Sequence, residues 1–302
     1  MNATSVRPSW KSVAVSLVGN GHVRREIPCQ DASAAIVTPR PALIVCDGRG
    51  SAAARLSQEG SRAAVHAFCA QVNILEPYIS SFLDRPDLSE EDWRDLCRIF
   101  YRTLVQAKLD CAAERHLDER EFDFTAAFAI AGTYHMGFFQ VGDGALVVRR
   151  GGMCETVFKP EKGEFANCTE FVRSGGDADG LFLSHILPVE GVDGLAATSD
   201  GPQHLMFRLS DMMPGKVFDV LFNRLHADEL SRNDVLDYLA RPQWAKDIRG
   251  DDDRSLIVMC PPPEASAEPE KSPDEPEKPA VVPQCASDES PKKEMHVEFA
   301  HD

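Results

Sequence analysis

Four aspartates are the residues of this sequence whose types and surroundings could do chemistry together. Asp47, Asp143 and Asp200 each follow an apolar run and precede a glycine, and Asp252 lies in an acidic triplet before the apolar run Ser255–Cys260. A strand end fixes a carboxylate, and a following glycine lets backbone carbonyls or water approach closely. Hard oxygen ligands of this kind select magnesium or manganese rather than zinc. The pattern therefore indicates a metal site built from oxygen ligands.

Each Asp-Gly pair has a simpler explanation when it is taken alone, because aspartate followed by glycine is a common turn. Here three such pairs and an acidic triplet all lie next to apolar runs. Turn residues have no reason to recur at every strand end, so the recurrence favours the metal site. Spacing alone leaves ordinary turns open as the alternative.

A polar segment upstream, GNGHVRREIPCQDAS, contains a fifth aspartate, Asp31, together with His22, Arg24 and Arg25. An arginine beside a metal site could hold a phosphate group through two parallel hydrogen bonds. The alternative is that these arginines are solvated residues before a strand, and the segment by itself favours neither interpretation.

Short strands and amphipathic helices are the elements that would position these residues. Strands are predicted at 13–18, 33–37, 42–46, 124–131, 136–141, 145–149, 156–158 and 255–260. Helices are predicted at 51–72, 215–226 and 231–240, and a Ser89–Asp92 capping box predicts a long helix at 90–115. Clusters of strands separated by helices favour an α+β layered domain.

Composition divides the chain into one predicted domain at 8–260 and a predicted disordered acidic tail at 261–302. Nine of the 20 prolines lie in this tail, together with eleven acidic residues and four lysines. A segment of that composition buries too little apolar surface to offset the entropy lost on ordering.

The overall composition excludes several classes of protein. The chain has 302 residues, 43% of them hydrophobic, which is enough for a sizeable core, and its formal net charge of −16 argues against a nucleic-acid partner. No apolar run approaches the roughly 20 residues of a membrane span, and the N-terminus lacks a signal-peptide core, so we expect no membrane partner and a cytoplasmic location. The nine cysteines include no C-x-x-C pair, which predicts free thiols.

Eight motifs, taken in order, resemble the type 2C (PPM, metal-dependent) Ser/Thr protein phosphatase family, in particular its bacterial branch. They are PCQDAS at 28–33, DGRGS at 47–51, SQEGSRAAV at 57–65, DFTAAFAI at 123–130, VGDG at 141–144, GEFANCTEF at 163–171, TSDG at 198–201 and DDRS at 252–255. Together they extend over nearly the whole predicted domain.

The resemblance implies a fold, a reaction and a substrate. The implied fold is α+β, a β-sandwich flanked by helical pairs. The implied reaction hydrolyses phosphoserine and phosphothreonine with two divalent ions, Mn²⁺ or Mg²⁺, which activate a bridging water without a phosphoenzyme. The implied partner is a phosphoprotein, either a Ser/Thr kinase or its targets.

The resemblance also implies roles for individual residues. Asp47 matches the aspartate that bridges the two ions, and Gly48 matches the residue whose carbonyl binds one of them. Asp200 and Asp252 match ligands of the other ion, and Asp31 matches a carboxylate that acts through water.

Asp143 matches a residue that helps to hold a weaker third ion in bacterial members. An acidic partner is often found four residues after the TSDG aspartate, and this chain has His204 there. Arg25 is the better match for the phosphate-binding arginine, ahead of Arg24.

Two further positions differ from the family pattern. Gln30 stands where a glutamate is frequent, and Arg49 stands where animal members have a histidine that could act as a general acid. Arg49 is a poor proton donor at neutral pH. Protonation of the leaving group would then fall to metal-bound water or to His22, or Arg49 would bind phosphate instead.

Two other functions stay open at this point. The Gln30 and Arg49 differences would suit a pseudophosphatase that binds phosphoproteins without turnover, although all the matching metal aspartates are present. A hydrolase of small phosphoesters would use the same chemistry on another substrate.

Overall fold

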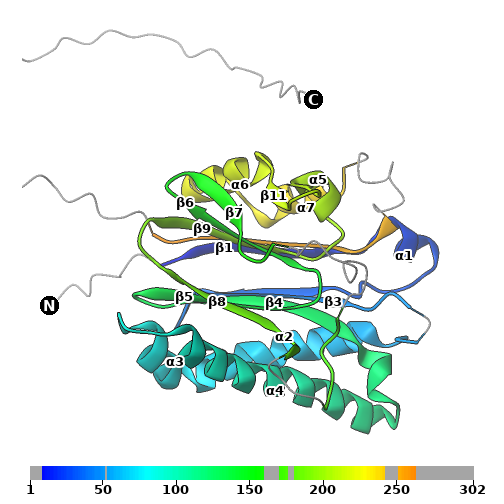
Figure 1. Cartoon of the computed structure of the whole chain (residues 1–302). Coiled ribbons are helices and arrows are strands. Elements are labelled where there is room, and N and C mark those ends of the chain that lie inside the picture. The colour runs from blue at the N-terminus through cyan, green and yellow to red at the C-terminus, as the bar shows by residue number, and fades with distance from the viewer. Residues whose placement is uncertain (1–8, 52, 160–169, 176–179, 242–250, 263–302) are drawn as a thin grey trace, which may run out of the picture. The chain divides into compact units, whose positions relative to one another are not determined.

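Two antiparallel sheets stacked face to face form the centre of the fold, and helices cover both outer faces (Figure 1). The computed structural model describes residues 9–51, 53–159, 170–175, 180–241 and 251–262. The first sheet contains, in spatial order, β1 (Lys11–Leu17), β12 (Arg254–Cys260), β9 (Val192–Thr198), β6 (Ala145–Arg150) and β7 (Met153–Thr156). The second contains β2 (Ala32–Ile36), β3 (Ala42–Gly48), β4 (Phe124–Ala131), β5 (His135–Val141) and β8 (Leu183–Pro188).

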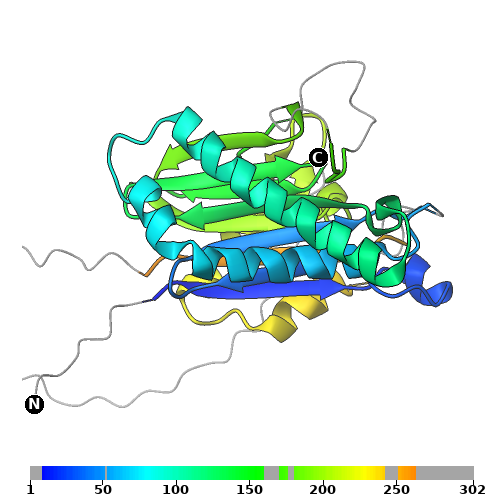
Figure 2. The same ribbon diagram turned by 90° about the horizontal axis from the view of Figure 1, so that it is seen from below.

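Helices on the outer faces bury the sides of the sheets that do not meet each other. The second sheet is covered by α2 (Ser57–Ile74), α3 (Glu76–Leu83) and α4 (Glu90–Arg115), which Figure 2 shows from below. The first sheet is covered by α6 (Val217–His226) and α7 (Arg232–Leu239). This arrangement confirms the predicted α+β fold, a β-sandwich flanked by helical pairs.

Strand β4 shows how side-chain size builds the two layers of the core. Its residues alternate between faces, as in any strand. Phe124, Phe128 and Ile130 face the helices, whereas Ala127 and Ala129 face the other sheet. Bulky residues therefore fill the space under the helices, and small residues let the two sheets approach.

The sequence located most of these elements, and β4 has the predicted bounds. The capping box of α4 is confirmed, because the side chains of Ser89 and Asp92 accept hydrogen bonds from each other's backbone N–H groups. The helix predicted at 51–72 instead begins at Ser57, since Leu56 is held in a turn by its hydrogen bond to the carbonyl oxygen of Glu121.

Other elements were misplaced or missed. The strand predicted at 156–158 is instead β7, because Gly151 and Gly152 both adopt positive φ and close a tight hairpin directly after β6. The missed elements are α1 (Asn20–Arg24), α3, η1 (Glu119–Phe122), β8, α5 (Gln203–Met206), β10 (Phe207–Arg208) and β11 (Met213–Pro214).

The predicted tail at 261–302 lies outside the described residues from 263 onward, and the domain boundary stays a prediction. In the part of the chain that the structure describes, no helix combines the length and the apolar character that crossing a bilayer requires.

Register places the strand ends that carry the aspartates at one end of the sandwich. Thr198 pairs with both Leu256 and Ala145, so the end of β9 meets the starts of β12 and β6. In the other sheet Asp47 pairs with Thr125, and Val141 pairs with Ala126. The five strand termini that flank the predicted aspartates therefore converge.

Candidate active site

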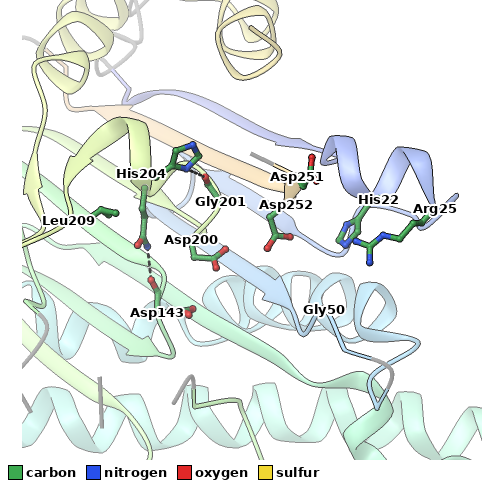
Figure 3. A pocket seen from close by; sticks show the side chains of 11 residues that line it. His22, Arg25, Gly50, Asp143, Asp200, Gly201, His204, Leu209, Asp251 and Asp252 are labelled. Atoms are coloured by element: carbon green, nitrogen blue, oxygen red, sulfur yellow. Dashed lines mark hydrogen bonds between the residues drawn. The ribbon is translucent and has the colours of Figure 1, made fainter. Parts of the chain in front are cut away.

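A cavity of about 420 Å³ opens at this end of the sandwich. Asp143, Asp200 and Asp252 line it, with His204 toward one side and His22 and Arg25 toward the other (Figure 3). Asp200 and Asp252 point into the same space in this view. Residues from both sheets thus meet over one cavity.

Asp47 and Asp200 come from different sheets, and their carboxyl groups lie close enough to interact directly. Burial, together with the negative charges of Asp31 and Asp200, raises the pKa of Asp47 well above its usual range. Burial is also the main reason why the pKa of Asp200 rises to about 6, with Asp143 and Asp252 adding to it. Carboxylates held this close resist ionisation unless a cation compensates them.

Asp31 lies deeper, with 4% of its surface exposed. Its Oδ2 accepts a hydrogen bond of 2.7 Å from the Ser199 hydroxyl. Burial raises its pKa to about 8, and the negative charge of Asp253 contributes to the rise. Asp31 Oδ1 and Asp200 Oδ1 are both buried without a hydrogen-bond partner among the described residues. Two buried carboxylate oxygens are therefore left as free acceptors.

Gly48 follows Asp47 at the end of β3 and is tightly enclosed. Its N–H donates a hydrogen bond of 3.1 Å to the carbonyl oxygen of Gln30. A Cβ at this position would lie 2.7 Å from that oxygen and 2.9 Å from the side chain of Ser57, so only glycine fits. The Gln30 side chain points away to Ser57 Oγ, at 2.8 Å.

The three aspartates of the acidic triplet have different roles. Asp251 forms an ion pair of 2.5 Å with Arg24, and Asp252 is exposed at the cavity wall. Asp253 is 2% exposed, and its two oxygens accept hydrogen bonds of 2.6 Å from the backbone N–H groups of Gly19 and Gln30. Asp253 thus ties the start of β12 to two loops from the N-terminal part of the chain.

Sequence reasoning missed Asp253, because one aspartate in a triplet looks like another. His22 Nδ1 lies 2.9 Å from Asp253 Oδ1, and 5% of the histidine is exposed. Asp253 therefore lies within ion-pair distance of His22, whose ring forms part of the cavity wall.

Arg24 and Arg25 differ in what they reach. Arg24 extends to Asp251, with 62% of its side chain exposed. Arg25 ends the short helix α1, donates from Nε to the carbonyl oxygen of Gly21 at 3.0 Å, and lines the cavity. Of these two neighbouring arginines, Arg25 is the one that faces the carboxylates.

Arg49 is held outside the cavity. Its guanidinium donates to Asp123 Oδ2 at 3.0 Å and lies 5.1 Å from the centre of the Phe171 ring, and its N–H donates to the carbonyl oxygen of Asp123 at 2.9 Å. Arg49 therefore anchors the turn that follows Asp47 and Gly48. It is not among the residues that line the cavity.

Asp143 and His204 lie on the opposite side of the cavity. Asp143 is exposed, and its carbonyl oxygen accepts a hydrogen bond of 2.6 Å from Gln203 Nε2. His204 Nδ1 lies 2.9 Å from the carbonyl oxygen of Gly201. The neighbouring Gln203 and His204 thereby fix this side of the cavity.

The donor set fits divalent ions chemically. Among the residues that the structure describes, no three His, Cys, Asp or Glu side chains already stand close enough to form a ready-made metal cluster. The buried Oδ1 atoms of Asp31 and Asp200 nevertheless lack a hydrogen-bond partner within the described ranges, and burial beside other carboxylates disfavours the charged form of Asp47, which a cation would favour. All these donors are hard oxygens, which suits Mg²⁺ or Mn²⁺.

Comparison with known proteins decides the family. Residues 18–240, well over half of the chain, match the protein phosphatase 2C family. The chain belongs to this family. The match covers Asp31, Asp47, Asp143 and Asp200, and the described acidic triplet lies beyond it.

Several bacterial proteins are similar to this chain. Serine/threonine-protein phosphatase 3 of Escherichia coli (strain K12) is 29% identical over 263 residues, which cover 83% of this chain and 98% of that protein. The structure of the serine/threonine phosphatase Stp1 from Staphylococcus aureus gives a TM-score of 0.57 at 13% identity, covering 86% of this chain and 99% of that one. The structure of PppA from Pseudomonas aeruginosa gives a TM-score of 0.54 at 17% sequence identity, and the match covers 83% of this chain and 97% of that one.

These comparisons confirm the predicted family and the predicted class of enzyme, a protein phosphatase. The two structural likenesses support the fold alone, because their sequence identities are low. The pseudophosphatase alternative is not favoured. The roles of individual residues at the site stay predictions.

The raised pKa values of the aspartates predict how the stability of the metal-free protein depends on pH. Because the pKa values of Asp31 and Asp200 are raised in the folded state, folding binds protons, and this stabilisation is lost as the pH rises through about 6 and then about 8. We expect the melting temperature in EDTA to fall by about 3 °C or more between pH 5.5 and 8.5. Differential scanning fluorimetry measures it.

Two comparisons isolate the carboxylates in that experiment. Asp31→Asn should flatten the pH dependence, whereas Asp87→Asn, at an 82% exposed side chain, should leave it unchanged. Saturating Mn²⁺ should raise the melting temperature more at pH 8.5 than at pH 5.5, because the ion replaces protons. A metal-free melting temperature that rises over this interval in the unaltered protein but not in Asp31→Asn would refute the explanation.

Proposed function

We propose that this chain is a metal-dependent phosphatase that hydrolyses phosphoserine and phosphothreonine in proteins with two divalent ions, Mn²⁺ or Mg²⁺. The observation that carries the proposal is the closeness of the Asp47 and Asp200 carboxyl groups, together with the buried Oδ1 atoms of Asp31 and Asp200, which have no hydrogen-bond partner in the part of the chain that the structure describes. Such a group of carboxylates is costly without a cation and is suited to holding one.

In this proposal Asp47, Asp200, Asp252 and the carbonyl of Gly48 would hold the ions, and Asp31 would act through water. Bound ions supply Lewis acidity, which neutralises phosphate charge and lowers the pKa of water. The protein's own contribution is to fix these oxygens on strand ends from two sheets, so that little reorganisation is needed when substrate binds.

Other residues of the cavity act on the substrate. Arg25 lines the cavity beside Asp252 and would hold the phosphate group, since a guanidinium presents paired donors to phosphate oxygens. His22, whose Nδ1 lies 2.9 Å from Asp253 Oδ1, would be the cavity residue that gives a proton to the leaving oxygen. A weaker third ion would use Asp143, whose carboxylate is exposed at the opposite wall.

Turnover in the presence and absence of metal tests the proposal. We expect hydrolysis of a phosphothreonine peptide and of p-nitrophenyl phosphate with millimolar Mn²⁺, and its loss in EDTA. Calorimetry should show Mn²⁺ or Mg²⁺ binding with release of protons. Turnover that persists in EDTA would overturn the mechanism.

Two specific outcomes would favour the other functions. If calorimetry shows no binding of Mn²⁺ or Mg²⁺ and the protein still binds phosphopeptides tightly, the chain is a pseudophosphatase. Turnover of small phosphoesters without turnover of phosphopeptides would indicate a small-molecule hydrolase. A kinase or its targets as substrate, and a cytoplasmic location, stay predictions.

A further inference from the structure

A second cavity, of about 490 Å³, lies where the edge strands β1 and β2 of the two sheets run side by side. Figure 2 shows β1, in dark blue, along this border of the sandwich. We call this second cavity the edge cavity. It shares no lining residue with the active-site cavity, although Asp31 forms part of its wall. The edge cavity is therefore a separate place at which a ligand can bind.

Two guanidinium groups line the edge cavity. Arg62 comes from α2, which covers the second sheet, and Arg232 is the first residue of α7, which covers the first sheet. Both residues are exposed, and neither forms a hydrogen bond or an ion pair within the ranges that the structure describes. Two helices thus each bring one available cation to the same cavity.

Available arginines are unusual in this acidic chain. The formal net charge is −16, and most of the described arginines are paired with a carboxylate. Arg62 and Arg232 depart from this pattern, and both line one cavity. Like charges gathered in one place raise each other's energy, and a bound anion would offset that cost.

Asp31 is the one acidic residue that lines the edge cavity, and it does not pair with either arginine. It is 4% exposed, and its Oδ2 accepts a hydrogen bond from the Ser199 hydroxyl inside the sandwich. Because Arg62 and Arg232 outnumber it, the lining keeps a net positive charge even when Asp31 is ionised.

Small side chains set the size and the chemistry of the edge cavity. Ser16 Oγ and Ser33 Oγ are 2.9 Å apart and join β1 to β2, and Ala14 and Ala34 lie beside them on the same strands. The lining contains no aromatic ring on which a nucleobase could stack. A volume of about 490 Å³ is within the usual range of small-molecule sites. The edge cavity therefore suits a compact anion.

We propose that the edge cavity binds a small phosphate-bearing anion, which Arg62 and Arg232 hold together. A guanidinium presents paired donors that match the geometry of phosphate oxygens. Two such groups attract a more highly charged anion more strongly, so diphosphate should bind better than phosphate. Since the two cavities have no lining residue in common, this inference does not depend on the proposed function.

Isothermal titration calorimetry with inorganic phosphate and with diphosphate tests the proposal. The full chain is used without metal ions, so that no cation in the active-site cavity attracts either anion. We expect diphosphate to bind about fivefold more tightly than phosphate or better. Arg62→Gln and Arg232→Gln should each raise the Kd for diphosphate by about five- to twentyfold. Raising the salt concentration from about 0.05 to about 0.5 M should weaken the binding.

Two control variants separate this site from other arginines. Arg102→Gln removes an exposed arginine that does not line the edge cavity, and Arg25→Gln removes the arginine of the active-site cavity. Both should leave the Kd for diphosphate within about twofold. The melting temperatures of Arg62→Gln and Arg232→Gln should stay within about 2 °C of the unaltered protein, because neither change removes a hydrogen bond or an ion pair.

Nuclear magnetic resonance places the ligand. His66 lines the edge cavity, whereas His116 is exposed just beyond the end of α4 and does not line it. Diphosphate should shift the ring resonances of His66 and leave those of His116 unchanged. Absence of any shift at His66 while diphosphate binds would overturn the proposal.

The calorimetry can also overturn the proposal in two ways. If Arg25→Gln weakens the binding of diphosphate and the two edge-cavity variants do not, the anion occupies the active-site cavity instead. If a peptide of residues 264–302 binds through Arg62 and diphosphate does not bind, the edge cavity holds an acidic segment of protein and not a phosphate-bearing anion.

Discussion

Replacing Asp47 with asparagine is expected to abolish metal-dependent turnover, lowering kcat/KM by about 10³-fold or more. Asparagine keeps the size of the side chain and one acceptor oxygen, so the end of β3 should stay in place. It removes the negative charge that, together with Asp31 and Asp200, makes this region require a cation. Initial rates with Mn²⁺ on a phosphothreonine peptide measure the loss.

The stability of the same variant separates loss of metal from loss of fold. Because burial and neighbouring carboxylates disfavour the charged form of Asp47, the metal-free Asp47→Asn protein should melt at the same temperature as the unaltered protein or higher. It should lose most of the Mn²⁺-induced rise in melting temperature. Asp87→Asn is the control and should keep both turnover and that rise. An Asp47→Asn protein that retains turnover within tenfold would contradict the assigned role.

Local patterns carried most of what the sequence could predict. The β4 run is apolar on both faces and ends at turns, so its bounds were predicted correctly. The Ser89–Asp92 capping box fixes the start of α4 within one turn of helix. Strand β8 was missed because it lies at a sheet edge, where its polar Ser184 and His185 are tolerated and no clear alternation results.

The candidate site was predictable as a set of aspartates but not as a set of contacts. Asp253 accepts hydrogen bonds from Gly19 and Gln30, which are more than 220 residues away in the sequence. Nothing local distinguishes it from Asp252. Arg49 likewise looked available for phosphate, and its pairing with Asp123 depends on how β3 and η1 pack. Such long-range pairs are set by tertiary structure.

Lys108 is the clearest residue whose role no local pattern could reveal, because a lysine on a long helix is normally solvated. Here 1% of it is exposed, and its ammonium group donates at 2.6 Å to both Asp123 Oδ1 and the carbonyl oxygen of Val172. The other oxygen of Asp123 accepts from Arg49, so the buried pair supports the turn after Asp47.

Lys108→Met is therefore expected to lower the free energy of unfolding by about 3 kcal/mol, since it leaves a buried carboxylate with one cation fewer. The value lies at the low end for broken buried pairs because Arg49 still contacts Asp123. The melting temperature should fall by about 6 to 12 °C. Urea unfolding monitored by circular dichroism measures the free energy directly.

A second variant distinguishes the buried pair from simple loss of a charge on α4. Arg102→Gln removes a cation from an exposed position on the same helix and should change the free energy of unfolding by less than about 0.5 kcal/mol. Asp123→Asn should be destabilising like Lys108→Met, and the double variant should cost less than the sum of the two. Because Asp123 anchors Arg49, Asp123→Asn should also reduce turnover at temperatures where the variant is fully folded. If the stability costs of the two single variants add exactly in the double variant and turnover is unchanged, the contacts of Lys108, Asp123 and Arg49 do not support the end of β3.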